Sequence, residues 1–182
     1  MSRLADALGV VRIAAAAAFP SALARTVDAP RGGSIPLLLF LVAAATDFFD
    51  GRLARRTGTT SRHGAVLDIA ADVAFVLAAS TSGAVLGLVP WTTPVAIAAA
   101  AGSYGLASAR AGRLAYSATG HAAGVGNYAL AGALSGAVAF PGSGLIRTLG
   151  AVSLLVTVVN LAAVIGRLRP RRVGSWRRDE DG

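Results

Sequence analysis

Six apolar stretches make up most of this sequence, and arginines, prolines or clusters of polar residues separate them. A helix needs about 20 mostly apolar residues to cross the hydrocarbon core of a bilayer, which is roughly 30 Å thick. The stretches cover residues 8–23, 34–49, 65–88, 91–106, 122–140 and 145–165. The first two are short, and we expect their helices to extend beyond the apolar residues. The pattern predicts an all-α, polytopic membrane protein with six transmembrane helices, forming a single domain over residues 1–182 with a basic tail at 167–182.

The composition agrees with a membrane protein. Hydrophobic residues make up 54% of the chain and charged residues only 14%, whereas about 25% of the residues of an average soluble domain are charged. The chain has no cysteine, which excludes disulfides, cysteine-ligated metals and cysteine nucleophiles. Its 17 basic residues against 9 acidic ones give a formal net charge of +8. In a chain this apolar, we expect the lipid bilayer and not a nucleic acid to be the partner of that charge.

The arginines divide unevenly between the two ends of the apolar stretches. Fourteen lie on the side of both termini, and only Arg25, Arg31 and Arg147 lie on the other side. Because basic loops resist translocation, this asymmetry predicts that both termini are cytoplasmic. An alternative is that the first 24 residues are a secretory signal that is cleaved after Ala24. Against it, Arg12 would interrupt the apolar part of such a signal, and five remaining spans would put the chain ends on opposite sides.

Acidic residues are nearly absent from the apolar part of the chain. Only four occur between positions 28 and 179, and they are Asp47, Asp50, Asp68 and Asp72. A carboxylate inside a membrane costs on the order of 2.5–3.5 kcal/mol, so it normally lines a polar cavity with a function. Spacings of three and four residues put each pair on one face of its helix. The fourteen-residue connection between Phe49 and Gly64 allows the two faces to meet.

Four clustered carboxylates repel one another unless cations neutralise them. Aspartate oxygens favour hard divalent ions such as Mg²⁺ or Mn²⁺, and two ions would balance the four charges. The alternative is that the aspartates are solvated at the depth of the lipid headgroups, or pair with nearby arginines, which are Arg52, Arg55, Arg56 and Arg62. Four aspartates at helical spacings, with no other acid in the region, favour the metal site.

Together with the residues between them, the aspartates form one continuous pattern. The segment from Asp47 to Asp72 reads DFFDGRLARRTGTTSRHGAVLDIAAD. This segment resembles the signature of the CDP-alcohol phosphatidyltransferase family at all eight fixed positions, with the same gaps between them. The positions are Asp47, Asp50, Gly51, Ala54, Arg55, Gly64, Asp68 and Asp72.

The resemblance implies an enzyme of phospholipid synthesis in the bacterial cell membrane, with its active site facing the cytoplasm. Such an enzyme transfers a substituted phosphate from a CDP-alcohol, here CDP-diacylglycerol, to the hydroxyl of an alcohol acceptor and releases CMP. It would use two Mg²⁺ or Mn²⁺ ions and would form a homodimer. The implied metal ligands are Asp47, Asp50, Asp68 and Asp72, and Asp72 would also be the general base. The implied nucleotide-binding residues are Asp50, Gly51, Ala54, Arg55 and Gly64.

Other positions carry weaker signals. Arg12 resembles an arginine that many family members have in their first span, although an arginine snorkelling to the membrane interface would give the same pattern. Arg110 and Arg113 suggest binding of a phosphate on the acceptor, such as glycerol 3-phosphate or an inositol phosphate. Topology alone would also place these two arginines at the cytoplasmic face. His121 follows Gly120 where several family branches have a Gly-Lys pair, which places it near the acceptor.

Three alternative functions remain open from the sequence. A CDP-amino-alcohol phosphotransferase acting on diradylglycerol has a similar signature. A cation transporter or channel could use the aspartates as an ion site, although all four lie at one membrane face and not at the midplane. A scaffold without activity could bind the nucleotide lipid, but the intact aspartates argue against it.

Overall fold

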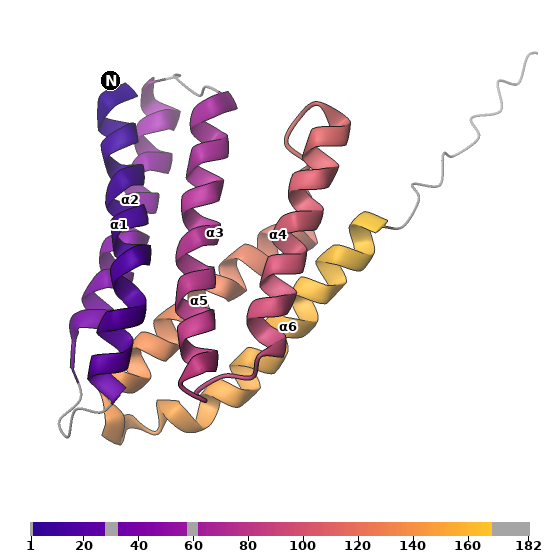
Figure 1. Cartoon of the computed structure of the whole chain (residues 1–182). Helices are drawn as coiled ribbons and strands as arrows, with labels where there is room; N and C mark the ends of the chain where they lie inside the picture. The colour runs from indigo at the N-terminus through magenta and orange to yellow at the C-terminus, as the bar shows by residue number, and fades with distance from the viewer. Residues whose placement is uncertain (1, 28–32, 58–61, 169–182) are drawn as a thin grey trace, which may run out of the picture.

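Six α-helices make up nearly all of the part of the chain that the structure, a computed structural model, describes (Figure 1). That part is residues 2–27, 33–57 and 62–168, with side chains described for residues 7–27, 33–49 and 64–168. The helices are α1 (Ser2–Val27), α2 (Ile35–Thr57), α3 (Arg62–Val85), α4 (Thr92–Ala111), α5 (Ala118–Ala139) and α6 (Leu145–Leu168), and a short 3-10 helix, η1 (Pro141–Ser143), precedes α6. These residues contain no strand, which confirms the all-α prediction. As expected, α1 and α2 extend beyond their apolar stretches, while the predicted tail from residue 169 onward lies outside the described residues.

Helix ends follow from the local sequence. The third apolar stretch continues to residue 88, but α3 ends at Val85 because Gly87 adopts a left-handed conformation with φ of 71°. Gly112 ends α4 in the same way, with φ of 63°. Helix α5 begins after Ser117, whose hydroxyl accepts a hydrogen bond of 3.1 Å from the amide of Gly120. The α4–α5 connection is therefore short, and it fixes where the first turn of α5 lies.

The surface of the bundle is apolar and part of its interior is polar, the reverse of a soluble protein. Large side chains such as Val85, Leu154 and Leu155 are more than 60% exposed, whereas Arg12 and Asn160 are buried. Within the described residues, three segments are long and apolar enough to cross a membrane, namely Ala7–Val27, Gly64–Val85 and Leu145–Leu168, and Ile35–Phe49 is a shorter apolar helix. These features support an integral membrane protein.

The helices pack in two groups that meet across α2, α3 and α5. Helix α1 packs on α2 and α3, and helix α6 packs on α4 and α5 (Figure 1). Three aromatic rings cross the junction. The ring of Phe19 on α1 meets that of Phe75 on α3 edge to face, with centroids 5.5 Å apart, and Phe75 stacks on Tyr128 of α5 at 6.1 Å. Phe75 lies one turn after Asp72 on α3, so the three packed aromatic rings adjoin the acidic residues.

Candidate active site

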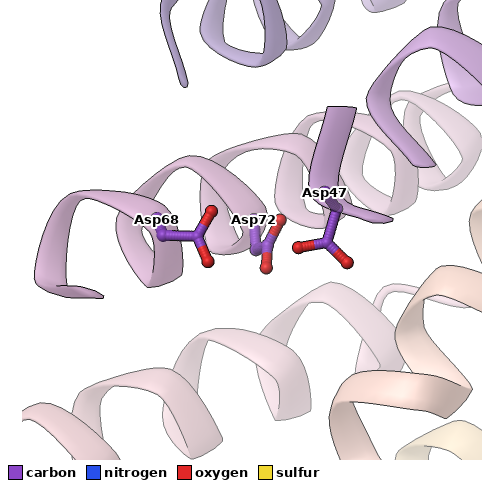
Figure 2. Close-up of side chains that lie close together, drawn as sticks. All are labelled: Asp47, Asp68 and Asp72. Atoms are coloured by element: carbon purple, nitrogen blue, oxygen red, sulfur yellow. The ribbon is translucent and has the colours of Figure 1, made fainter. Parts of the chain in front are cut away.

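Three of the four aspartates singled out from the sequence lie close together on α2 and α3. Asp68 and Asp72 are one turn apart on α3, and Asp47 reaches them from α2 (Figure 2). Each offers one carboxylate oxygen within 4.8 Å of the other two. The expectation that the two helix faces meet is confirmed for these three residues, while the side chain of Asp50 lies outside the described side chains.

A buried arginine from α1 joins the three carboxylates. Nη1 of Arg12 donates to Oδ1 of Asp68 at 2.6 Å and to Oδ1 of Asp72 at 2.7 Å, and its Nη2 lies 3.7 Å from Oδ1 of Asp47. The Arg12 side chain is fully buried, whereas the three carboxylates are 28–46% exposed. The alternative of a snorkelling arginine is therefore wrong, because the packing of α1 on α3 directs Arg12 into the bundle, where the carboxylates attract it.

Tyr128 on α5 is a further partner of the cluster, and no pattern in the sequence indicated it. Its hydroxyl donates a hydrogen bond of 2.5 Å to Oδ1 of Asp72. The same oxygen accepts the bond from Arg12, and no other described side chain donates to Asp72. Asp72 is therefore held through one oxygen by α1 and α5, while its second oxygen keeps its capacity to accept a proton or bind a cation.

The donor set fits a divalent cation. It consists of carboxylate oxygens from two helices, which is the chemistry that hard ions such as Mg²⁺ prefer. One guanidinium against three carboxylates leaves a net charge of −2 among these described side chains. A bound cation would reduce the repulsion that remains.

A cavity of about 950 Å³ lies beside the cluster and is bounded by residues of α2 to α6 and of the α4–α5 connection. Asp47, Asp72 and Tyr128 lie on its wall. Most of the remaining wall consists of alanine, valine and other apolar residues, with Ser117, His121, Asn127, Asn160 and Arg167 as polar exceptions. A volume of this size is in the range of small-molecule and cofactor sites.

Arg167 places a second cation on the far side of this cavity. Its Nη1 donates to the carbonyl of Ala100 and to the hydroxyl of Ser103, both at 3.0 Å, and its guanidinium lies 5.5 Å from the ring centroid of Tyr104. Its Nε is buried without a hydrogen-bond partner in the structure. Gly120 makes room for this side chain, because a Cβ there would collide with Nη2 of Arg167. No carboxylate within the described residues pairs with Arg167, so an anion in the cavity would complement it.

Comparison with known proteins identifies this arrangement. The model of the CDP-alcohol phosphatidyltransferase family matches residues 2–165, which is most of the chain. The chain belongs to the CDP-alcohol phosphatidyltransferase family. Membership confirms the resemblance seen in the sequence and favours the transferase over the transporter or channel. No solved structure matches the chain.

Two relatives of this family member carry the same name, CDP-diacylglycerol–glycerol-3-phosphate 3-phosphatidyltransferase. The one from Cereibacter sphaeroides is 56% identical over 43 residues, which are 24% of this chain and 20% of the relative. The one from Yersinia pestis is 55% identical over 42 residues, which are 23% of each protein. The matches thus span less than a quarter of the relatives. Together with the family, these names indicate an enzyme of phospholipid synthesis.

The nucleotide-binding part of the family signature is only partly described. The last eight residues of α2 include four signature positions whose side chains lie outside the described ones, and they are Asp50, Gly51, Ala54 and Arg55. Gly64 lies in the first turn of α3, one turn before Asp68. The roles of all five residues stay predictions.

The three residues expected near the acceptor occupy different environments. His121 lies on the cavity wall in the first turn of α5, with its ring 6.4 Å from that of Tyr116. Arg110, in the last turn of α4, and Arg113, just beyond it, are exposed and are not among the described residues that line the cavity. Arg167 does line it, although the sequence grouped this residue with the basic tail.

Proposed function

We propose that this protein transfers the phosphatidyl group of CDP-diacylglycerol to a hydroxyl of glycerol 3-phosphate and releases CMP. The observation that carries the proposal is the carboxylate cluster of Asp47, Asp68 and Asp72, two of which, Asp47 and Asp72, lie on the wall of a cavity large enough for a small-molecule substrate. The names of the relatives support glycerol 3-phosphate as the acceptor. The partly buried cation Arg167 on the same cavity wall supports an acceptor that carries a phosphate.

Asp72 is the proposed general base. The acceptor oxygen attacks the phosphorus that bears diacylglycerol, its proton passes to Asp72, and the bond from that phosphorus to the oxygen of CMP breaks. Arg12 and Tyr128 hold one oxygen of Asp72, which leaves the other oxygen for the proton. The electron pair of the broken bond goes to the oxygen that leaves with CMP, so the charge that develops during the reaction lies on the phosphate of CMP.

Asp47, Asp50, Asp68 and Asp72 are the proposed ligands of two divalent ions, Mg²⁺ or Mn²⁺. When bound, such ions polarise the diphosphate and stabilise the charge that develops on departing CMP. Arg55 is proposed to bind the diphosphate, and the small residues Gly51, Ala54 and Gly64 to leave space for the nucleotide. We propose that Arg167 and His121 bind the acceptor inside the cavity. Arg110 and Arg113 are proposed to attract its phosphate from outside the cavity lining.

The proposed setting is a bacterial cell membrane, crossed by all six helices, with both termini and the active site at the cytoplasmic face. The excess of arginines near these helix ends supports that orientation. A homodimer is proposed from the family resemblance alone.

The test is CMP release from CDP-diacylglycerol by the purified protein with Mg²⁺ or Mn²⁺. The acceptor panel includes glycerol 3-phosphate, an inositol phosphate and diradylglycerol with CDP-amino-alcohol donors. Metal-dependent release with glycerol 3-phosphate, absent from the Asp72→Asn variant, supports the proposal. Release only with another acceptor or donor, or no release by folded protein that binds CDP-diacylglycerol, contradicts it.

A further inference from the structure

Two asparagines on the cavity wall, buried Asn160 and partly buried Asn127, form an amide pair between α5 and α6. Nδ2 of Asn160 donates to Oδ1 of Asn127 at 2.8 Å and to the backbone carbonyl of Val156 at 2.8 Å. Asn160 is only 1% exposed, and both asparagines line the cavity. Helix packing accounts for the bond between the two side chains but leaves part of their hydrogen-bonding capacity unused.

The orientation of the Asn160 amide follows from its partners. Both partner atoms are oxygens that only accept, so the atom facing them is the nitrogen. Oδ1 of Asn160 is therefore the opposite atom, and it is buried without a hydrogen-bond partner in the structure. A buried acceptor of this kind normally has a partner, which in a cavity wall is a ligand or a water molecule.

The amide pair offers both halves of a hydroxyl-binding site. Oδ1 of Asn160 can accept a hydrogen bond. Asn127 accepts the bond from Asn160 through its Oδ1, and its Nδ2 donates to none of the described residues. A hydroxyl group donates one hydrogen bond and accepts others, so it complements this pair, whereas a phosphate has no proton to give to Oδ1 of Asn160. We infer that Asn127 and Asn160 bind a hydroxyl group of the acceptor.

The position of the pair indicates which hydroxyl it binds. Both asparagines line the same cavity as Asp72, the proposed general base, and Tyr128, which bonds to Asp72. Arg167 is seven residues after Asn160 on the same face of α6, about 10 Å further along the helix axis, and it lines the same cavity. The general base, the asparagine pair and the Arg167 cation thus line one cavity.

This inference rests on the proposed function and identifies the feature of the acceptor that the site recognises. Glycerol 3-phosphate has two hydroxyl groups, and one of them is the nucleophile. The hydroxyl that does not react is the one assigned to Asn127 and Asn160, with the phosphate toward Arg167. The pair then selects acceptors with a vicinal hydroxyl over simple alkanol phosphates.

The test compares glycerol 3-phosphate with 3-hydroxypropyl phosphate, which lacks the hydroxyl that does not react. CMP release gives kcat/KM for both acceptors in the wild-type protein and in the variants Asn160→Leu and Asn127→Leu. We expect the wild type to prefer glycerol 3-phosphate by about 100-fold or more, because sites that hydrogen-bond a hydroxyl strongly reject analogues without it. In each variant the ratio of the two kcat/KM values should fall to about threefold. The KM for glycerol 3-phosphate should rise, and the KM for 3-hydroxypropyl phosphate should change little.

Ser153→Ala is the matched control. Ser153 is buried on α6 two turns before Asn160, its hydroxyl has no hydrogen-bond partner, and it is not among the residues that line the cavity. This variant should keep the wild-type preference. Because the preference is a ratio measured on one sample, a variant that folds in lower yield still reports it. If Asn160→Leu does not fold, Asn127→Leu supplies the answer, since it leaves the bond from Asn160 to Val156 in place.

The outcomes separate the two proposals. No CMP release by the wild type with glycerol 3-phosphate overturns the proposed function and this assignment with it. Release without a preference for glycerol 3-phosphate over the analogue overturns only the hydroxyl site. Equal losses with both acceptors in the asparagine variants also overturn it, because they indicate a packing role, with water as the partner of Asn160.

Discussion

The two walls of the cavity balance their charges differently. On the wall built by α2 and α3, the partly exposed carboxylates of Asp47 and Asp72 share, together with Asp68, one fully buried guanidinium from α1. On the wall built by α4, α5 and α6, Arg167 bonds only to uncharged oxygens and the other polar groups are mostly amides and hydroxyls. The first wall therefore suits cations and a proton, and the second suits a phosphate and a hydroxyl. The difference predicts that changes to the first wall abolish the reaction, whereas changes to the second alter the choice and affinity of the acceptor.

Asp72→Asn should have the largest effect. The substitution keeps the size of the side chain but removes a base and a metal ligand, and loss of a general base alone typically lowers the rate 10²- to 10⁴-fold. We expect kcat for CMP release to fall by about 10³-fold or more with every acceptor. Activity in the wild type should also disappear with a chelator and return with Mg²⁺ or Mn²⁺. A variant that kept its kcat and lost only affinity for one acceptor would contradict the division between the walls.

Arg12→Met tests how the first wall is stabilised. Without the guanidinium, the carboxylates of Asp47, Asp68 and Asp72 repel one another without compensation. Removing one partner of a buried ion pair costs about 3–5 kcal/mol, and the partial exposure of the carboxylates lowers our expectation to about 2 kcal/mol. Thermal unfolding should show the loss clearly in metal-free buffer and less in Mg²⁺, because the ion replaces part of the missing charge.

Arg25→Met, at the exposed end of α1, is the control for loss of an arginine from the same helix. It should leave the unfolding temperature unchanged in both buffers. A destabilisation of Arg12→Met that is the same with and without Mg²⁺ would mean that Arg12 supports packing and not the charge balance of the site.

Arg167→Gln should raise the KM for glycerol 3-phosphate by about 10- to 100-fold, the range for loss of a charge-assisted hydrogen bond. The KM for CDP-diacylglycerol should change little, because Arg167 lies on the opposite wall from the acidic cluster. Arg110→Gln and Arg113→Gln remove exposed arginines outside the cavity lining and should have smaller effects. An equal or larger KM increase in these two variants would move the phosphate site outside the cavity lining.

Tyr128→Phe should lower kcat by about tenfold, because Asp72 loses one of the two donors that orient it. The ring stays stacked on Phe75, so the unfolding temperature should change little. Phe75→Leu is the reciprocal control, since it removes the stacking and keeps the hydroxyl. It should lower stability more and kcat less, and the opposite order would show that Tyr128 acts through packing.

The acidic wall was predictable from the sequence because its aspartates lie close together in the chain, in pairs on neighbouring turns of a helix. Helical spacing places Asp68 and Asp72 on one face, and a carboxylate in an apolar stretch is so costly that it indicates a function. The partners of these residues were not predictable in the same way. Tyr128, Asn127 and Asn160 are isolated polar residues on apolar helices, and only the packing of α5 against α3 and α6 brings them to the cavity.

Arg167 is another residue whose place in the site depends on tertiary packing and not on its neighbours in the sequence. In the sequence it begins a run of basic residues, a pattern typical of a cytoplasmic tail. Its place on the cavity wall depends on α4 supplying the carbonyl of Ala100 and on α5 supplying a residue without a side chain, Gly120. Neither condition is visible from the neighbours of Arg167 in the chain.

Gly120→Ala is the mildest test of the second wall. The new methyl group would collide with Nη2 of Arg167 and would lie 2.7 Å from the hydroxyl of Ser117. The arginine side chain is flexible and can shift, and alanine is a better helix former than glycine by about 1 kcal/mol, so the unfolding temperature should hardly fall. The displaced guanidinium should instead raise the KM for glycerol 3-phosphate about threefold, with kcat unchanged. Gly102→Ala on α4, where a Cβ meets nothing within 4 Å, isolates the gain in helix propensity and should leave KM unchanged. Equal KM values for the two alanine variants would mean that the space opened by Gly120 does not position Arg167 for the acceptor.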